Sequence, residues 1–389
     1  MHFPLTRSLT TALLAAASIG AGAQTLLTQI PLPAPSGLLT DLAYVSADSA
    51  YNRVYVAVQA EGPPPEYASA TYLLVYDGAS NQLLKTVTLP VFQTVLPPLI
   101  DIVRNLIYIP ACNTYCSLLV VDRRRDTLVK TIALPQQIDG LLSLQAVIDP
   151  TTGKVYVSGI QGGYGYAPVT LAVLESEETG QINVYDIPEA TGELAMSPYA
   201  HRIYFPSSTQ PTYPDMDYPM QLTFFDTLSN QVTEVVTFSK GGTNGDLSMY
   251  KLLHPVVNTN TGHIFGQYNN YSEYKIAVLD STGNVLANMG TGFYSDPQYA
   301  TGPIVVDPKK NLSFALVGQG NGDFQIAVVD GDTNTIAPSS GATLTAYEYG
   351  IPPSFSINPD TSRLYITYVG SATMVSPCES YCLYVYSEQ

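Results

Sequence analysis

The sequence predicts an all-β fold, a seven-bladed β-propeller with four antiparallel strands in each blade. Three observations predict it: a phrase that recurs seven times, apolar and polar residues that alternate with period two, and two chain ends that together supply one missing strand. In each copy of the phrase an aromatic residue follows a turn-forming polar residue by seven positions. The polar residues are Asp48, Asp101, Asp149, Ser197, Asn258, Asp307 and Asn358, and the aromatic residues are Tyr55, Tyr108, Tyr156, Tyr204, Phe265, Phe314 and Tyr365.

The spacing between copies, 48 to 61 residues, is the length of a four-stranded blade. In the third copy we expect a first strand at 145–148, a turn at 149–153 and a second strand at 154–159. The third strand of a copy ends at an Asp-containing turn, as at 74–78, and an amphipathic fourth strand follows, as at 84–90. After residue 23 no segment has a helical period, so the prediction is strands throughout.

The two ends of the chain predict how the ring closes. The seventh copy stops at 384–386, after its third strand, while residues 26–33 resemble other fourth strands, two of which also end in Leu-Pro, at 89–90 and 134–135. We therefore expect the N-terminal strand to complete the last blade, which leaves no unpaired edge between the first and last blades.

The repeats resemble those of the YVTN-type seven-bladed β-propellers over essentially the whole chain after residue 23. The segment Lys154-Val155-Tyr156-Val157-Ser158-Gly159 is the closest copy of that signature, 53–57 and 363–367 are looser, and the copies at Phe265 and Phe314 have diverged. The resemblance implies the fold and little about activity, because propellers host many unrelated functions.

Residues 1–23 are predicted to be an export signal. Arg7 supplies a positive start, residues 9–19 are apolar but too short to span a bilayer, and Ala21-Gly22-Ala23 has the pattern that signal peptidase cleaves. No Cys follows the predicted cut, so no lipid anchor is expected. We therefore expect a secreted or periplasmic protein without a membrane span, with residues 24–389 forming a single propeller.

The charge balance disfavours nucleic acid as a partner. Sixteen basic residues face 32 acidic ones, and removal of Arg7 leaves a net charge of −17, which repels phosphate backbones. The basic run Arg123-Arg124-Arg125 lies beside Asp122 and Asp126, where we expect a solvated hairpin turn rather than a ligand site.

Long segments between the second and third strands are rich in Tyr and Pro, and Tyr combines a large stiff ring with a hydroxyl suited to recognition. We expect a protein or glycan ligand at the face that these segments share. An alternative is that the Tyr side chains pack on one another and stiffen the segments. The candidate ligand-binding residues are Tyr166, Tyr213, Tyr218 and Tyr268, with Tyr44 and Gln145 at the channel mouth.

The four cysteines form two pairs with the same spacing, Cys112 with Cys116 and Cys378 with Cys382. Three intervening residues place both thiols across a tight hairpin end, so in an exported protein we expect two local disulfides. A four-thiolate zinc site would require the pairs to converge, but they lie on the second and seventh blades, and we predict no metal site.

One register of the innermost strands, eleven residues before each aromatic, contains polar residues that would face the channel mouth. It holds Tyr44, Pro97, Gln145, Glu193, His254, Pro303 and Ser354. Glu193 and His254 come from neighbouring blades and are candidates for an acid–base pair. The alternative is a channel lined with water in which no chemistry occurs.

The sequence contains no G-x-S-x-G, H-E-x-x-H or C-x-x-C-H motif and no Trp, so we expect no cofactor. The leading hypothesis is a monomeric, non-enzymatic binding or scaffold propeller. The alternative is a channel-mouth enzyme of lactonase, lyase or dehydrogenase type that acts on a small molecule.

Overall fold

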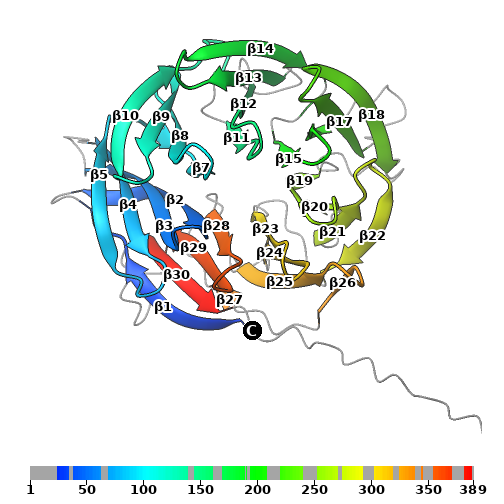
Figure 1. Ribbon diagram of the computed structural model, residues 1–389. Helices are drawn as coiled ribbons and strands as arrows, with labels where there is room; N and C mark the ends of the chain where they lie inside the picture. Colours follow the sequence, from blue (N-terminus) through cyan, green and yellow to red (C-terminus); the bar gives the residue numbers. More distant parts are fainter. Residues whose placement is uncertain are drawn as a thin grey trace, which may run out of the picture.

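The protein is a ring of seven four-stranded blades around a central axis (Figure 1). The computed structural model describes residues 24–34, 38–62, 69–138, 144–160, 169–188, 190, 193–207, 220–239, 252–269, 274–291, 302–318, 324–337, 343–344, 354–369 and 381–387. No helix occurs among these residues, and the strand alternation predicted from the sequence is confirmed.

Each blade follows the chain outward from the axis, and every strand pair within it is antiparallel. Blade 1 contains β2 (Leu39–Asp48), β3 (Arg53–Glu61), β4 (Ser69–Asp77) and β5 (Leu83–Leu89). Blade 2 contains β6 (Thr94–Val95), β7 (Leu99–Asp101), β8 (Leu106–Cys112), β9 (Cys116–Asp122) and β10 (Thr127–Ala133). Blade 3 contains β11 (Gln145–Ile148), β12 (Val155–Ile160), β13 (Val169–Ser176) and β14 (Gln181–Ile187). Blade 4 contains β15 (Ala195–Ser197), β16 (Arg202–Ser207), β17 (Met220–Asp226) and β18 (Gln231–Ser239).

The remaining three blades repeat this order. Blade 5 contains β19 (Leu253–Val257), β20 (Ile264–Asn269), β21 (Tyr274–Leu279) and β22 (Val285–Gly290). Blade 6 contains β23 (Ile304–Asp307), β24 (Leu312–Gly318), β25 (Phe324–Asp330), β26 (Thr335–Ile336) and β27 (Thr343–Leu344), the last two both pairing with β25. Blade 7 contains β28 (Ser354–Asn358), β29 (Arg363–Val369), β30 (Tyr381–Ser387) and, outermost, β1 (Thr25–Pro31).

The predicted ring closure is confirmed. β1 pairs antiparallel with β30, from Thr25 opposite Ser387 to Pro31 opposite Cys382. A second link joins the innermost strands of blades 7 and 1, because the Ser354 hydroxyl accepts the Val45 N–H at 3.0 Å. Both ends of the chain therefore hold the last blade in the ring, and Figure 1 shows β1 and β30 side by side.

The core consists of seven apolar clusters, and each fills the space between two neighbouring blades. The seven repeated aromatic residues are all fully buried in these layers. Packing between blades therefore uses the aromatic at one fixed position of the repeat, which explains why the sequence shows it every 48 to 61 residues.

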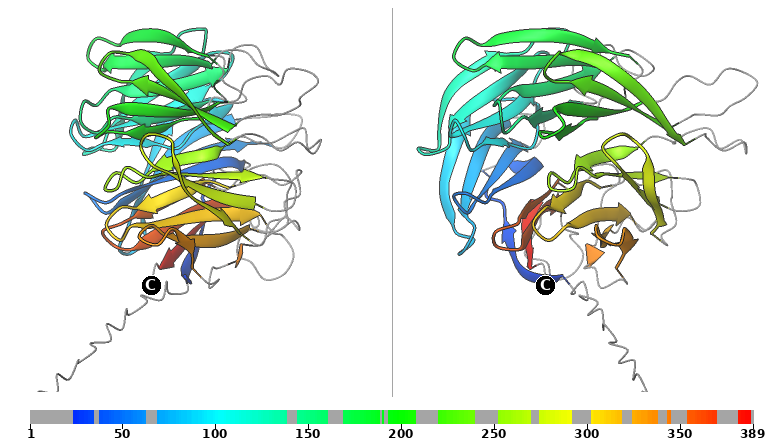
Figure 2. Two further views of the ribbon diagram at one scale, coloured as in Figure 1. Left: turned by 90° about the vertical axis from the view of Figure 1, so that its right-hand side faces the viewer. Right: turned by 45° about the vertical axis from the view of Figure 1, so that its right-hand side comes forward.

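Strand direction divides the ring into two faces. The turns that join first to second strands and third to fourth strands lie on one face, which we call the turn face. The segments that join second to third strands leave the ring at the opposite face, which we call the loop face. The left view of Figure 2 shows the disc edge-on, with the hairpin turns of the described strands gathered on one side.

Candidate functional site

The turn face is built from one repeated device. Seven polar residues, one per blade, end the first strand and are at most 3% exposed. In each turn the side-chain oxygen accepts backbone N–H groups two or three residues further on, as Asp48 does from Ala50 at 3.0 Å and Tyr51 at 3.3 Å. This explains the preference for Asp, Asn and Ser at this position of the repeat. The seven residues are Asp48, Asp101, Asp149, Ser197, Asn258, Asp307 and Asn358.

The fourth residue after each capping residue has a left-handed backbone, with φ between 48° and 73°. The positions are Asn52, Asn105, Gly153, His201, Gly262, Asn311 and Ser362. Asn and Gly tolerate this conformation best. Two of these residues also meet the capping residue of the preceding blade: the Asn358 side chain donates to the Asn52 oxygen at 3.1 Å, and the Asn258 side chain donates to the Asn311 oxygen at 2.7 Å.

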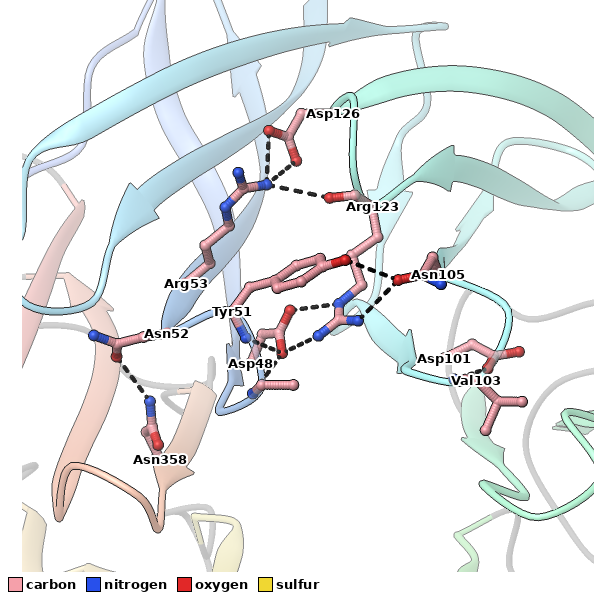
Figure 3. Close-up of polar contacts among 11 residues, drawn as sticks. Asp48, Tyr51, Asn52, Arg53, Asp101, Val103, Asn105, Arg123, Asp126 and Asn358 are labelled. Atoms are coloured by element: carbon pink, nitrogen blue, oxygen red, sulfur yellow. Dashed lines mark hydrogen bonds and ion pairs between the residues drawn. The ribbon is translucent and has the colours of Figure 1, made fainter.

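Between blades 1 and 2, a buried guanidinium group, instead of an Asn side chain, binds the capping residue of the preceding blade (Figure 3). Arg123, from the turn after β9, is 2% exposed and donates to both oxygens of Asp48 at 2.5 Å. The Tyr51 ring covers the guanidinium, whose carbon lies 3.9 Å from the ring centroid. The Tyr51 hydroxyl donates to Asn105 at 3.0 Å. A bidentate, stacked arginine of this kind fixes the relative position of two blades.

A second ion pair extends this contact between blades 1 and 2. Arg53 donates to Asp126 and to the Arg123 carbonyl oxygen, at 3.0 and 3.1 Å. Burial raises the pKa of the Asp126 carboxyl above its ordinary value of 3.8, and this effect outweighs the attraction of Arg53. Two ion pairs, Arg123 with Asp48 and Arg53 with Asp126, therefore lie side by side at one blade interface.

The expectation that the whole run 123–125 is a solvated turn is wrong for Arg123 and confirmed for Arg124 and Arg125, which are exposed. The sequence carried a signal that would have identified Arg123. The residue after the Asp that ends the third strand is small in other blades: Gly78, Thr227, Ser281 and Gly331. A Cβ at Gly78 would overlap Asn52 of the same blade, so a large side chain at this position marks a turn that is packed differently.

The candidate channel-mouth residues lie in the innermost strands, with Gln145 and Ser354 at the loop-face ends of β11 and β28 and Tyr44 in the middle of β2. Tyr44 in β2 is half-buried, and burial together with the nearby Asp41 raises its pKa. Gln145 in β11 is also half-buried and lies opposite Ser158. Ser354 is buried and holds the Val45 amide, so its hydroxyl serves the blade 7–blade 1 contact.

Glu193 and His254 are in contact, but Glu193 binds the backbone N–H of His254 and not its imidazole ring. The Glu193 carboxylate accepts the His254 N–H at 2.5 Å across the interface between blades 4 and 5. His254 has a φ of 50°, and the pairing of β19 with β20 is irregular between Leu253 and Val256. A left-handed non-glycine residue costs roughly 1–2 kcal/mol, and such strain concentrates at functional sites. The proposed acid–base role of the two side chains stays a prediction.

The candidate ligand-binding tyrosines of the loop face divide into two groups. Tyr166, Tyr213 and Tyr218 lie outside the described residues. Tyr268, in β20, is 5% exposed, and its hydroxyl donates to Asn288 of the same blade at 2.6 Å. Because its ring packs in the cluster between blades 4 and 5, Tyr268 offers little surface to a ligand.

One predicted disulfide is confirmed: Cys112 and Cys116 are bonded, with their Cα atoms 4.0 Å apart. They end β8 and begin β9, so the bond closes the loop-face end of blade 2. Cys382 is also disulfide-bonded, whereas Cys378, its predicted partner, lies outside the described residues. Tyr115, between the first pair, is 61% exposed.

Within the described ranges, no group of three or more His, Cys, Asp and Glu side chains is arranged to hold a metal ion. Among the same residues, no helix has the length and apolar character needed to cross a membrane.

Comparison with known proteins supports the fold and no family. No known family model and no curated protein matches the chain, so membership of the YVTN-type family stays a prediction. Among solved structures, hydrazine synthase of Kuenenia stuttgartiensis is 13% identical with a TM-score of 0.57, covering 85% of this chain and 95% of that chain. The Cps50 (Swd1) β-propeller domain of Myceliophteria thermophila is 7% identical with a TM-score of 0.58, covering 94% and 100%. A chain of the mitotic checkpoint complex is 10% identical with a TM-score of 0.60, covering 100% and 98%.

Proposed function

We propose that this protein is an exported, non-enzymatic propeller that binds a protein or a glycan at its loop face. The observation that carries the proposal is the placement of the strand ends. All seven second-to-third-strand segments start and finish on one face, and their lengths range from three residues after Cys112 to twelve after Ser207. A regular ring that carries connecting segments of unequal length on one face is the usual arrangement of a binding scaffold.

The composition of these segments favours recognition. Tyr supplies stiff contact area at a low cost in conformational entropy, and its hydroxyl can bond to sugars or peptide groups. The segments between strands contain Tyr164, Tyr166, Tyr213, Tyr218 and Tyr271.

The ring is a suitable base for such a surface because the blades are linked to one another by buried polar contacts. Arg123, Asn258 and Asn358 each bind a neighbouring blade. A rigid base lowers the entropy that binding must remove. One structural neighbour is a chain of the mitotic checkpoint complex, which accords with a role in assembly.

The export part of the proposal rests on residues 1–23 and on the cysteines. Disulfides persist in oxidising compartments, and Cys112 and Cys116 are bonded. We propose cleavage after Ala23, a secreted or periplasmic location and a propeller formed by residues 24–389. N-terminal sequencing of the protein from fractionated cells tests this: a chain that starts at Gln24 supports it, and a cytoplasmic chain that retains Met1 contradicts it.

A triple Tyr166→Ala, Tyr213→Ala, Tyr218→Ala variant tests the ligand-binding face. We expect binding to a glycan array or to a displayed peptide library to fall at least roughly tenfold, since stacking and hydroxyl contacts are lost. The melting temperature serves as the check on folding. Tyr199→Ala, an exposed tyrosine on the turn face, is the matched control. Binding that survives the triple substitution, or falls equally with Tyr199→Ala, would contradict the proposal.

A second candidate is a channel-mouth enzyme of lactonase, lyase or dehydrogenase type, and the strained backbone of His254 held by Glu193 favours it. Hydrazine synthase, an enzyme by its name, is among the structural neighbours. His254→Ala and Glu193→Gln variants, assayed on a panel of lactones and alcohols, separate the two functions. Turnover by the wild type that both variants lose would establish the enzyme. Absence of turnover in the wild type would leave the binding function.

A further inference from the structure

The strand that closes the ring begins two residues after Ala23, where the export signal is proposed to be cleaved. β1 starts at Thr25, opposite Ser387 at the turn-face end of β30, and the Ser387 hydroxyl donates to the Thr25 carbonyl oxygen at 3.5 Å. Gln24, which cleavage would make the first residue of the chain, is only 7% exposed. The new N-terminus would therefore lie against the folded ring rather than on a free tail.

Gln24 occupies a place that hairpin turns fill in other blades. Asp126, Asn230 and Asn334 come immediately before the outer strands β10, β18 and β26, and each ends the turn that connects its outer strand to the third strand. In blade 7 the outer and third strands come from opposite ends of the chain, so no such turn precedes β1. Cleavage after Ala23 thus leaves every pair between β1 and β30 in place.

A free N-terminus at this position would bury a charge. An α-amino group has an ordinary pKa of about 7.7–8.0, so most of it is protonated at neutral pH. An ammonium group removed from water is costly unless an anion or hydrogen-bond acceptors compensate for it. Glutamine can remove this charge by itself, because its side-chain amide lies within reach of its own α-amine and the two can close a five-membered ring.

We propose that Gln24 of the exported chain is converted to pyroglutamate, a modification that rests on the cleavage after Ala23 proposed above. The α-amine nitrogen attacks Cδ of the Gln24 side chain and a new C–N bond forms. The bond from Cδ to Nε2 breaks, and the amide nitrogen leaves as ammonia with a proton from the amine. The reaction needs no oxidant and no second reactant. Its product is a neutral lactam that keeps one N–H donor and one carbonyl acceptor.

The cyclised end would protect the ring closure. Aminopeptidases bind a free α-amino group, and proteolysis concentrates at chain ends. Loss of residues from this end would shorten β1, which pairs with Tyr384 and Tyr386 of β30. Both tyrosines are at most 7% exposed and would lose their outer neighbour. A blocked N-terminus therefore keeps the last blade at four strands in an exported protein.

The mass of the N-terminal peptide tests the modification. Free amino groups of the intact exported protein are first dimethylated, and trypsin then releases residues 24–53, since Arg53 is the first cleavage site after Gln24. We expect this peptide to carry no dimethyl group and to be lighter than its sequence by one ammonia. Labelling before digestion excludes cyclisation during sample handling. A dimethylated peptide that begins at Gln24 overturns the modification and leaves the cleavage standing, whereas a chain that begins at any other residue overturns both.

Gln24→Asn is the matched variant, because the shorter amide would have to close a smaller, strained ring and stays open. After the same cleavage, its N-terminus should be dimethylated. Incubation with a broad-specificity aminopeptidase should remove residues from the N-terminus of the variant, whereas the wild type should keep the peptide 24–53 intact. Equal loss from the two proteins, or loss from neither, contradicts the protection of β1.

Discussion

The blade 1–blade 2 interface and the blade 5–blade 6 interface use the same position of the repeat in different ways. In the first, Asp48 is charged and bound by the buried guanidinium of Arg123. In the second, Asn258 is neutral, and its amide group alone reaches Asn311 of the next blade. The repeat thus fixes where a polar contact is needed and leaves its chemistry open. A neutral contact needs only one residue from each blade, whereas a buried carboxylate requires a cation beside it.

The aromatic layer shows the same difference. Blade 1 has Tyr55 beside Arg53, and burial raises the pKa of the Tyr55 hydroxyl to about 12. Blade 5 has Phe265 at this position, with no hydroxyl to satisfy. The blade 1–blade 2 interface is therefore rich in polar and charged groups that bond to one another. The blade 5–blade 6 interface is almost independent of charge.

The largest effect should come from removing the cation of the first interface. Arg123→Met leaves Asp48 buried and without its partner, which should lower the free energy of unfolding by about 3–5 kcal/mol. Asn258→Ala, in the other interface, should cost only about 1–2 kcal/mol, the loss of neutral hydrogen bonds. Denaturant unfolding of both variants gives the comparison.

The double variant Asp48→Asn, Arg123→Met is the control for this prediction. It removes both charges, so it should be less destabilised than the sum of the single variants. Equal costs for Arg123→Met and Asn258→Ala would show that the charged network adds nothing beyond ordinary hydrogen bonding.

Two glycines of blade 3 allow a similar comparison at the blade 2–blade 3 interface. Gly153 and Gly180 have φ of 69° and 68°, so alanine should strain both backbones alike. A Cβ at Gly153 would overlap the Arg104 guanidinium, whereas at Gly180 the nearest atom is 3.8 Å away. Gly180→Ala should cost about 1–2 kcal/mol, and Gly153→Ala should cost more because it also displaces Arg104 from the Thr152 carbonyl oxygen. Thermal unfolding measures both, and a Gly180→Ala variant that is less stable than Gly153→Ala would contradict the arrangement.

The smallest effect should be a difference in the response to acid. At Asp280 in blade 5, burial alone would raise the pKa, but hydrogen bonds from Thr282 and Asn284 outweigh it and lower the pKa from 3.8 to about 2. The stabilisation by this carboxylate is complete above pH 3.8 and is lost as the pH falls towards 2. Asp126 between blades 1 and 2 has a raised pKa, so its ionised form costs stability above that pKa and the cost disappears on acidification.

Unfolding curves of Asp280→Ala and Asp126→Asn between pH 6 and pH 2 test this contrast. As the pH falls, the wild type should lose stability relative to Asp280→Ala. Over the same range, the wild type should gain stability relative to Asp126→Asn. Parallel trends for the two variants would show that these two carboxylates do not differ in this way.

Part of the candidate site was also accessible from the sequence. Their shared position in the repeat predicted that Glu193 and His254 lie on neighbouring blades. In the structure the Glu193 carboxylate accepts a hydrogen bond from the His254 N–H. The prediction did not include the left-handed backbone of His254, because this conformation arises from the irregular pairing of β19 with β20. Tyr268 was expected at a binding surface, but side-chain direction along a strand alternates, and its ring points into the core.

The sequence by itself determined the number of blades, their strand order and the closure by β1, because these follow from local periodicity and from repeated positions such as Asp149 and Tyr156. Only the tertiary structure decided what those positions contact. Arg123 lies 75 residues from Asp48, and its burial depends on Tyr51 and Asn105 meeting it across the blade interface. Local pattern fixes strands and turns since their hydrogen bonds lie close in sequence, whereas the pairing of charges depends on blades that meet only when the ring is complete.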